Sequence, residues 1–191
     1  MEFEKVLSER YSVRSFSEKK VEREKVDKIL HAAALAPTAK NNQPQKIFVI
    51  ESREGLEKVK KCTVCHFDAP LVFLICFDSS VSWKSHFDGR DFGPIDASIV
   101  TTQMMLEATN IGLGTTWVGL FDPETTRQVF ELPENIVPVH FCLPGILPKG
   151  VFLTKDTSCV RKLRKFLKIF KKLPKKGGFL FAKILFCIYN V

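Results

Sequence analysis

The chain has 191 residues, of which 45% are hydrophobic and 26% charged, and its net charge is +8. This length suits one compact domain with a substantial core, and no uninterrupted apolar run reaches the roughly 18 residues that a membrane-spanning helix needs. The first ten residues lack the apolar core of a secretory signal, so we expect a cytoplasmic protein whose six cysteines are reduced.

Two helices are expected at the start of the chain. Residues 2–9 predict a short helix, and residues 22–35 predict a longer one that stops at Pro37. The longer helix repeats apolar residues at three- and four-residue spacing, which places them on one buried face. These residues are Val26, Ile29, Leu30 and Ala33. His31 lies among them and is interpreted as a core or interface histidine rather than a catalytic base.

The next segments predict two strands and a short helix. A polar loop over Thr38–Pro44 precedes a strand over Lys46–Glu51, and Ser52 is placed to cap a short helix that runs to Lys60. The nearly continuous apolar run Leu71–Phe77 is typical of a central strand that is buried on both faces.

A long helix follows over Ile95–Asn110, which Gly112 closes, and Asp96 places a negative charge near its N-terminus. Thr115–Val118 predicts another buried strand. The elements after it are a helix over 123–130 and a strand over 137–142. Because helices and strands do not alternate strictly, the order favours an α+β fold.

The end of the chain differs in charge from the rest. Residues 149–191 contain 12 lysines and arginines and one acidic residue, whereas residues 1–148 contain 17 basic and 20 acidic residues. This contrast predicts a domain over 1–148 and a divergent basic C-terminal tail over 149–191. The amphipathic stretch Lys162–Lys176 suits a solvated helix, a disordered tail or contact with an anionic membrane surface. No base-reading module accompanies the charge, so we expect no nucleic-acid partner.

Three segments carry groups that suit a bound ligand. If Arg10–Arg14 is extended, the alternating side chains of Arg10, Ser12 and Arg14 share one face, which suits a phosphate or an electron-rich heterocycle. The amides of Thr38–Pro44 offer donors and acceptors to a flavin or purine edge. Taken singly, these segments are also explained by a solvated turn and by an ordinary loop with Asx turns.

The third segment is Ile111–Asp122, where glycines bracket a short strand. Gly119 would let backbone N–H groups approach a planar ligand closely. The G-x-G-x-x-G spacing of a dinucleotide fold and the glycine-rich phosphate loop are both absent. By itself the segment also fits a helix cap followed by a core strand.

In their order and spacing, four segments resemble the nitroreductase family of FMN-dependent oxidoreductases, from about Glu4 to Gly145. They are Glu9–Phe16, Ala36–Pro44, Ile95–Val100 and Gly112–Gly119. The resemblance implies an α+β fold with a mixed, mainly antiparallel sheet flanked by helices. It also implies a homodimer with FMN at the interface, where each flavin contacts both chains.

The resemblance assigns residues to the flavin. The resemblance implies that Arg10–Arg14 holds the phosphate, the ribityl chain and the ring edge. It implies that Thr38–Gln43 packs on the isoalloxazine and its ribityl side, and that Val118–Leu120 meets the ring through its backbone. The implied cofactor-binding residues are Arg10, Tyr11, Ser12, Arg14, Thr38, Ala39, Asn41, Gln43, Val118, Gly119 and Leu120. Hydride transfer is the flavin's own chemistry, so we expect no essential catalytic side chain and no metal ligand.

The implied function is reduction of nitro compounds, quinones or similar small acceptors with NADH or NADPH. The alternatives are a flavin-binding protein with impaired turnover, and a membrane-surface or interaction protein that acts through its tail. Relatives usually supply a further basic residue to the FMN phosphate after the point where this resemblance ends. Arg161 and Arg164 are candidates to replace it, and a change of reading frame near Ile146 is a second hypothesis, which sequencing the gene tests.

The stretch Cys62–His66 has the C-x-x-C-H spacing of covalent haem attachment. That attachment normally requires export, and a zinc site would need a second pair of ligands with matching spacing. Two ordinary thiols before a buried strand are therefore the preferred interpretation.

Overall fold

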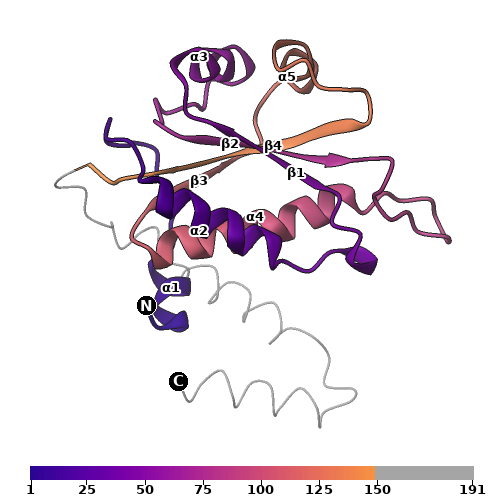
Figure 1. The fold of residues 1–191 in the computed structure, drawn as a ribbon, viewed down its shortest axis with the longest axis horizontal. Coiled ribbons are helices and arrows are strands. Elements are labelled where there is room, and N and C mark those ends of the chain that lie inside the picture. Colours follow the sequence, from indigo (N-terminus) through magenta and orange to yellow (C-terminus); the bar gives the residue numbers. More distant parts are fainter. Residues whose placement is uncertain (149–191) are drawn as a thin grey trace, which may run out of the picture. The chain divides into compact units, whose positions relative to one another are not determined.

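The computed structural model describes residues 1–148, in which helices flank a four-stranded sheet with the strand order β1-β2-β4-β3 (Figure 1). All three pairs of neighbouring strands are antiparallel. The strands are β1 (Gln45–Ile50), β2 (Val72–Asp78), β3 (Gly114–Val118) and β4 (Ile136–Gly145). The helices are α1 (Phe3–Glu9), α2 (Arg23–Ala34), the short 3-10 turn η1 (Ala39–Asn41), α3 (Arg53–Cys62), α4 (Gly93–Asn110) and α5 (Pro123–Val129).

The sheet separates two apolar cores. Helices α2 and α4 cover one face and α3 and α5 cover the other (Figure 1). Along β2, Phe73 and Ile75 pack in the first core, whereas Leu74 and Cys76 pack in the second, because successive side chains of a strand point to opposite faces. The predicted α+β fold and its central, doubly buried strand are confirmed.

The predicted elements are all present, with ends that differ by a few residues. Ser52 caps α3 as expected, since its hydroxyl accepts a hydrogen bond of 3.1 Å from the Gly55 N–H. Strand β4 continues to Gly145, beyond the predicted end, because Leu143 and Pro144 pair with residues of β3. Helix α4 begins at Gly93, two residues before the predicted start at Ile95.

One placement is wrong. His31 is exposed on α2, so it is not a core histidine, and its place at an interface stays a prediction. No helix within residues 1–148 is long and apolar enough to cross a membrane. The basic tail, with Arg161, Arg164 and the amphipathic stretch, lies outside the described residues, and its boundary stays a prediction.

Candidate functional site

The segment Arg10–Arg14 lies along the outer edge of β3. Ser12 forms a parallel bridge with Thr115, and the Val13 N–H donates to the Thr115 carbonyl at 2.9 Å. The Thr116 hydroxyl donates to the Val13 carbonyl. Arg10, Tyr11 and Ser12 are half-buried, Val13 is buried and Arg14 is exposed. The edge strand thereby fixes the backbone that carries the two arginines.

The arginines of this segment are not neutralised by nearby acids. Within residues 1–148 neither Arg10 nor Arg14 forms an ion pair, and the Arg14 guanidinium makes one hydrogen bond, of 3.3 Å, to the Ser12 carbonyl. The Tyr11 hydroxyl oxygen is buried and has no partner among these residues. Two guanidiniums with spare donors and an adjacent hydroxyl form a donor set that suits a phosphate.

The loop Thr38–Gln43 has an unusual backbone. Lys40, Asn41 and Gln43 all have a positive φ, between 48° and 55°, a conformation that non-glycine residues seldom adopt. The loop is closed internally, because the Thr38 hydroxyl accepts from the Gln43 N–H at 3.0 Å and the Gln43 side-chain amide donates to the Asn41 side chain at 3.3 Å. Such strain is maintained only where surrounding contacts determine the loop shape, and it clusters at functional sites.

Asp96 ties this loop to helix α4. Its Oδ1 accepts a hydrogen bond of 2.9 Å from the Ala39 N–H, whereas its Oδ2 is buried without a partner among the described residues. The side chain is 2% exposed, and burial raises the pKa of its carboxyl group. Asp96 lies in the first turn of α4, as the sequence predicts. The sequence did not predict that its carboxylate would also accept a hydrogen bond from the loop before β1.

At the other end of β3, Val118 is the last strand residue, and Gly119 and Leu120 are exposed. Within residues 1–148 the backbone N–H groups of Gly119 and Leu120 donate to no protein acceptor. A Cβ atom added to Gly119 would meet a single neighbour, Nε1 of Trp117, at 3.9 Å. Packing among the described residues 1–148 therefore does not demand a glycine here, and the open backbone can approach a ligand closely.

The sheet brings two of these segments together and separates the third. Arg10–Arg14 lies beside β3 and Val118–Leu120 continues from the end of β3, so both are at one edge of the sheet. The loop Thr38–Gln43 leads into β1 at the opposite edge, where the Pro44 carbonyl accepts from the Asp78 N–H. Three strand spacings, about 14 Å, lie between the edges. Within one chain the loop Thr38–Gln43 is therefore separated from the other two segments by the width of the sheet.

A model of the nitroreductase family matches residues 7–67 and 65–146, which together span most of the chain. The chain belongs to the nitroreductase family. A crystal structure of a nitroreductase family protein from Clostridium difficile 630 is 38% identical, with a TM-score of 0.79, and the match covers 85% of this chain and 96% of that one. The expected family membership is confirmed.

Two curated relatives of this nitroreductase-family chain carry names for activities. A Methanothermobacter thermautotrophicus protein, provisionally named NADH dehydrogenase/NAD(P)H nitroreductase, is 32% identical over 157 residues, which cover 78% of this chain and 77% of the relative. The FMN reductase [NAD(P)H] of Bacillus subtilis is 26% identical over 159 residues, which cover 74% of this chain and 64% of the relative.

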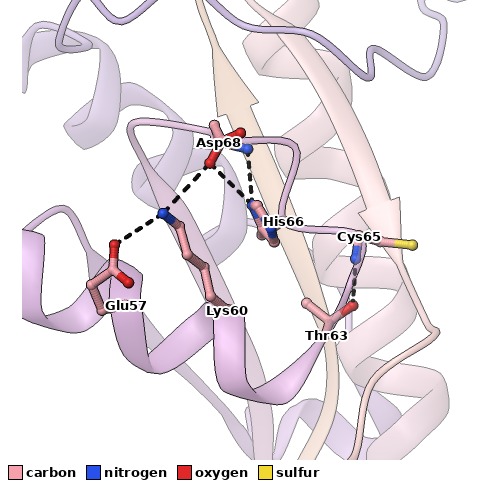
Figure 2. A network of polar contacts seen from close by, with 6 residues as sticks. All are labelled: Glu57, Lys60, Thr63, Cys65, His66 and Asp68. Atoms are coloured by element: carbon pink, nitrogen blue, oxygen red, sulfur yellow. Dashed lines mark hydrogen bonds and ion pairs between the residues drawn. The ribbon is translucent and has the colours of Figure 1, made fainter.

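The Cys62–His66 stretch of this nitroreductase-family chain does not assemble a ligand set. Figure 2 shows the Cys65 side chain pointing away from His66, whose Nδ1 accepts from the Asp68 N–H at 3.1 Å. Cys62 is buried, and its thiol donates to a backbone carbonyl of α3. No group of three or more His, Cys, Asp or Glu side chains within residues 1–148 could hold a metal ion, and the four cysteines there are free thiols.

Sequence reasoning missed the buried His140 of β4. Its Nε2 lies 2.8 Å from the Thr101 hydroxyl oxygen, and its ring stacks on Trp117 of β3 with a centroid separation of 3.8 Å. Burial lowers the pKa of His140 to about 3, so the imidazole is neutral in the folded protein at ordinary pH. The sequence does carry a signal for this burial, because His140 and the apolar Cys142 lie two positions apart and so share one face of the predicted strand over 137–142.

Proposed function

We propose that this nitroreductase-family chain is an FMN-dependent oxidoreductase that reduces small acceptors, such as nitro compounds or quinones, with NADH or NADPH. The observation that carries the proposal is the arrangement along β3. Two guanidiniums that have no carboxylate partner within residues 1–148 lie beside the strand, and two backbone N–H groups that have no acceptor there lie at its end. This donor set matches a ligand with a phosphate at one end and an electron-accepting ring at the other.

The residues present fit FMN. Arg10, Ser12 and Arg14 would hold the phosphate and the ribityl chain, because guanidinium forks bind phosphate through several charge-assisted hydrogen bonds. The N–H groups of Gly119 and Leu120 would face the ring. When bound, FMN supplies the two-electron chemistry that links NAD(P)H to the acceptor. The protein's own groups bind and orient, and backbone donors near the ring favour its reduced, negatively charged form.

The working form in this proposal is a homodimer. The loop Thr38–Gln43 is separated from β3 by the width of the sheet, so a second copy would bring that loop to the flavin. A groove of about 970 Å³ between α1, α2 and α4 suits such an interface, because it is lined by exposed apolar side chains. Those that are at least 40% exposed are Met1, Phe3, Leu35 and Ile99. His31 also lines the groove, which keeps its interface role as a proposal.

The first experiment is the visible spectrum of the full-length protein supplied with FMN, followed by anaerobic addition of NADH and then NADPH. A flavin spectrum that bleaches, from a particle that light scattering sizes as two chains, supports cofactor, reaction and assembly together. A colourless protein that does not take up FMN overturns the proposal. A spectrum that bleaches but does not recover with a nitroaromatic or a quinone would favour the alternative of a flavin-binding protein with impaired turnover.

The variant that tests the phosphate assignment is Arg14→Ala. Loss of charge-assisted hydrogen bonds should raise the Kd for FMN by about tenfold or more. The matched control is Arg53→Ala, which removes an exposed arginine from α3, on the face of the sheet opposite α2 and α4. Unchanged FMN affinity in Arg14→Ala would remove that residue from the site.

A further inference from the structure

We infer that Thr63 is a positioning residue for the proposed cofactor site: its hydroxyl holds the Leu120 carbonyl so that the backbone N–H groups of Gly119 and Leu120 stay directed at the ligand. Thr63 belongs to the C-x-x-C-H stretch, which the proposed function does not otherwise use. The inference rests on the proposed function, because it concerns the geometry of the same site.

The contact joins two segments that are distant in sequence. The Thr63 hydroxyl donates to the Leu120 carbonyl at 2.6 Å and accepts from the Cys65 N–H at 3.0 Å (Figure 2 shows the second contact). Thr63 is 6% exposed, so water does not readily replace either bond. The residue is also the C-cap of α3, where its own N–H donates to the Val59 carbonyl at 3.1 Å. The hydroxyl is therefore held in place from the helix side as well.

A second bond from the end of the same helix completes the attachment. The Asp122 N–H donates to the Cys62 carbonyl at 2.9 Å, and the Asp122 side chain caps α5 by accepting from the N–H groups of Glu124 and Thr125. The C-terminal end of α3 thus fixes the chain at residues 120 and 122, on the way into α5.

The opposite side of the segment is fixed by the sheet, because Val118 pairs with Phe141 of β4. Between the two anchors lie Gly119 and Leu120, whose N–H groups have no acceptor within residues 1–148. Leu120 is 69% exposed, so its side chain does not anchor the backbone. Just beyond Leu120 the chain is held by the Asp122 N–H bond and by the Phe121 ring, which packs against Phe141. Within residues 1–148 the hydrogen bond from Thr63 is the only one made to Leu120 itself.

The test compares Thr63→Val, which keeps the side-chain shape and removes the donor, with Thr63→Ser, which keeps the hydroxyl. Thr63→Ala is a second hydroxyl-free variant in case the valine variant does not fold. The matched control is Thr126→Val, which removes a buried hydroxyl of α5 that donates to the carbonyl of the N-cap residue Asp122 at 2.7 Å. The Kd for FMN, the midpoint potential of the bound flavin and its visible spectrum are measured in the full-length protein, together with Tm.

We expect Thr63→Val and Thr63→Ala to raise the Kd for FMN about fivefold to tenfold, the equivalent of one hydrogen bond. Their midpoint potential should fall and their flavin spectrum should shift, because donors near the ring favour its reduced form. Thr63→Ser and Thr126→Val should keep the wild-type potential and spectrum even where Tm falls.

Three results would overturn the inference. Unchanged potential and affinity in the two hydroxyl-free variants would show that Thr63 does not position the site. Equal changes in Thr126→Val would show a general effect of lost buried hydroxyls. A wild-type protein that takes up no FMN would instead overturn the proposed function, and the inference with it.

Discussion

Acidification from about pH 7.5 to about pH 5 should destabilise the folded protein through His140. The imidazole is 1% exposed, and its ring lies between the Thr101 hydroxyl and the indole of Trp117. Desolvation lowers its pKa from 6.5 to about 3, so the folded protein keeps His140 neutral over this range. The unfolded chain takes up a proton at this residue as the pH falls through its ordinary pKa, and protons therefore favour unfolding.

The size of the effect follows from the two pKa values. At pH 5 the unfolded histidine is about 1.5 pH units below its pKa, and each unit corresponds to about 1.4 kcal/mol, so the loss is about 2 kcal/mol relative to pH 7.5. This loss of stability depends little on how far below 5 the pKa of folded His140 lies, because the folded protein keeps the imidazole neutral at pH 5 in either case. Asp96 has the opposite sign, since its raised pKa favours the folded state in acid. Asp122, with a lowered pKa, loses its contribution only at more acidic pH.

The assay is urea unfolding of the wild type and of His140→Phe at both pH values, with equal FMN present throughout. Phenylalanine keeps a flat ring against Trp117, and Thr101 keeps its own acceptor, the Ala97 carbonyl, at 2.9 Å. The wild type should lose about 2 kcal/mol more than the variant between pH 7.5 and pH 5, whatever their absolute stabilities. His140→Gln is a second non-titrating variant. Equal losses in all three proteins would refute the assignment of acid sensitivity to His140.

Two further substitutions test the scaffold. In Gly114→Ala the new Cβ would lie 2.5 Å from Cγ2 of Val13, so the Arg10–Arg14 segment has to shift. We expect the free energy of unfolding, measured in urea, to fall by about 1–3 kcal/mol, and FMN binding to weaken. Unchanged FMN affinity would contradict this. Ser52→Ala removes the acceptor for the Gly55 N–H and should cost about 1 kcal/mol without altering FMN affinity, whereas Ser52→Asp should keep most of the stability. A flavin effect of Ser52→Ala would argue against its purely structural role.

Much of the fold could be predicted because local signals agree with the tertiary structure. The apolar run at Leu71–Phe77 has no periodicity, and the strand it forms is buried on both faces. The end of β4 could not be predicted, because it depends on pairing with β3 rather than on local pattern. The exposure of His31, by contrast, follows from the helical period itself, because the turn of the helix that gathers Val26, Ile29 and Ala33 on one face points position 31 away from that face.

The candidate site was predictable as a set of segments but not as a geometry. Resemblance selected the residues, yet the positive φ values of Lys40 and Asn41 appear only in three dimensions, as does the hydrogen bond from the Ala39 N–H to the Asp96 carboxylate. The contact of Thr63 with Leu120 joins residues 57 positions apart and leaves no local signature. Which groups lack partners, as the Gly119 N–H does within residues 1–148, is likewise a property of the folded chain.

The strand order also bears on how this protein is made. Strand β4 is the last strand of the described chain, yet it lies inside the sheet and bonds to both β2 and β3. During synthesis, β1 and β2 can pair early as neighbours, but β3 can bond only to the short Arg10–Arg14 segment until its neighbour β4, residues 136–145, leaves the ribosome. Apolar surface on α4 and β2 stays uncovered until then, which is the condition under which nascent chains need chaperones. A chain truncated before residue 136 should therefore accumulate as aggregate, whereas one that ends after residue 145 has all four strands that the structure describes.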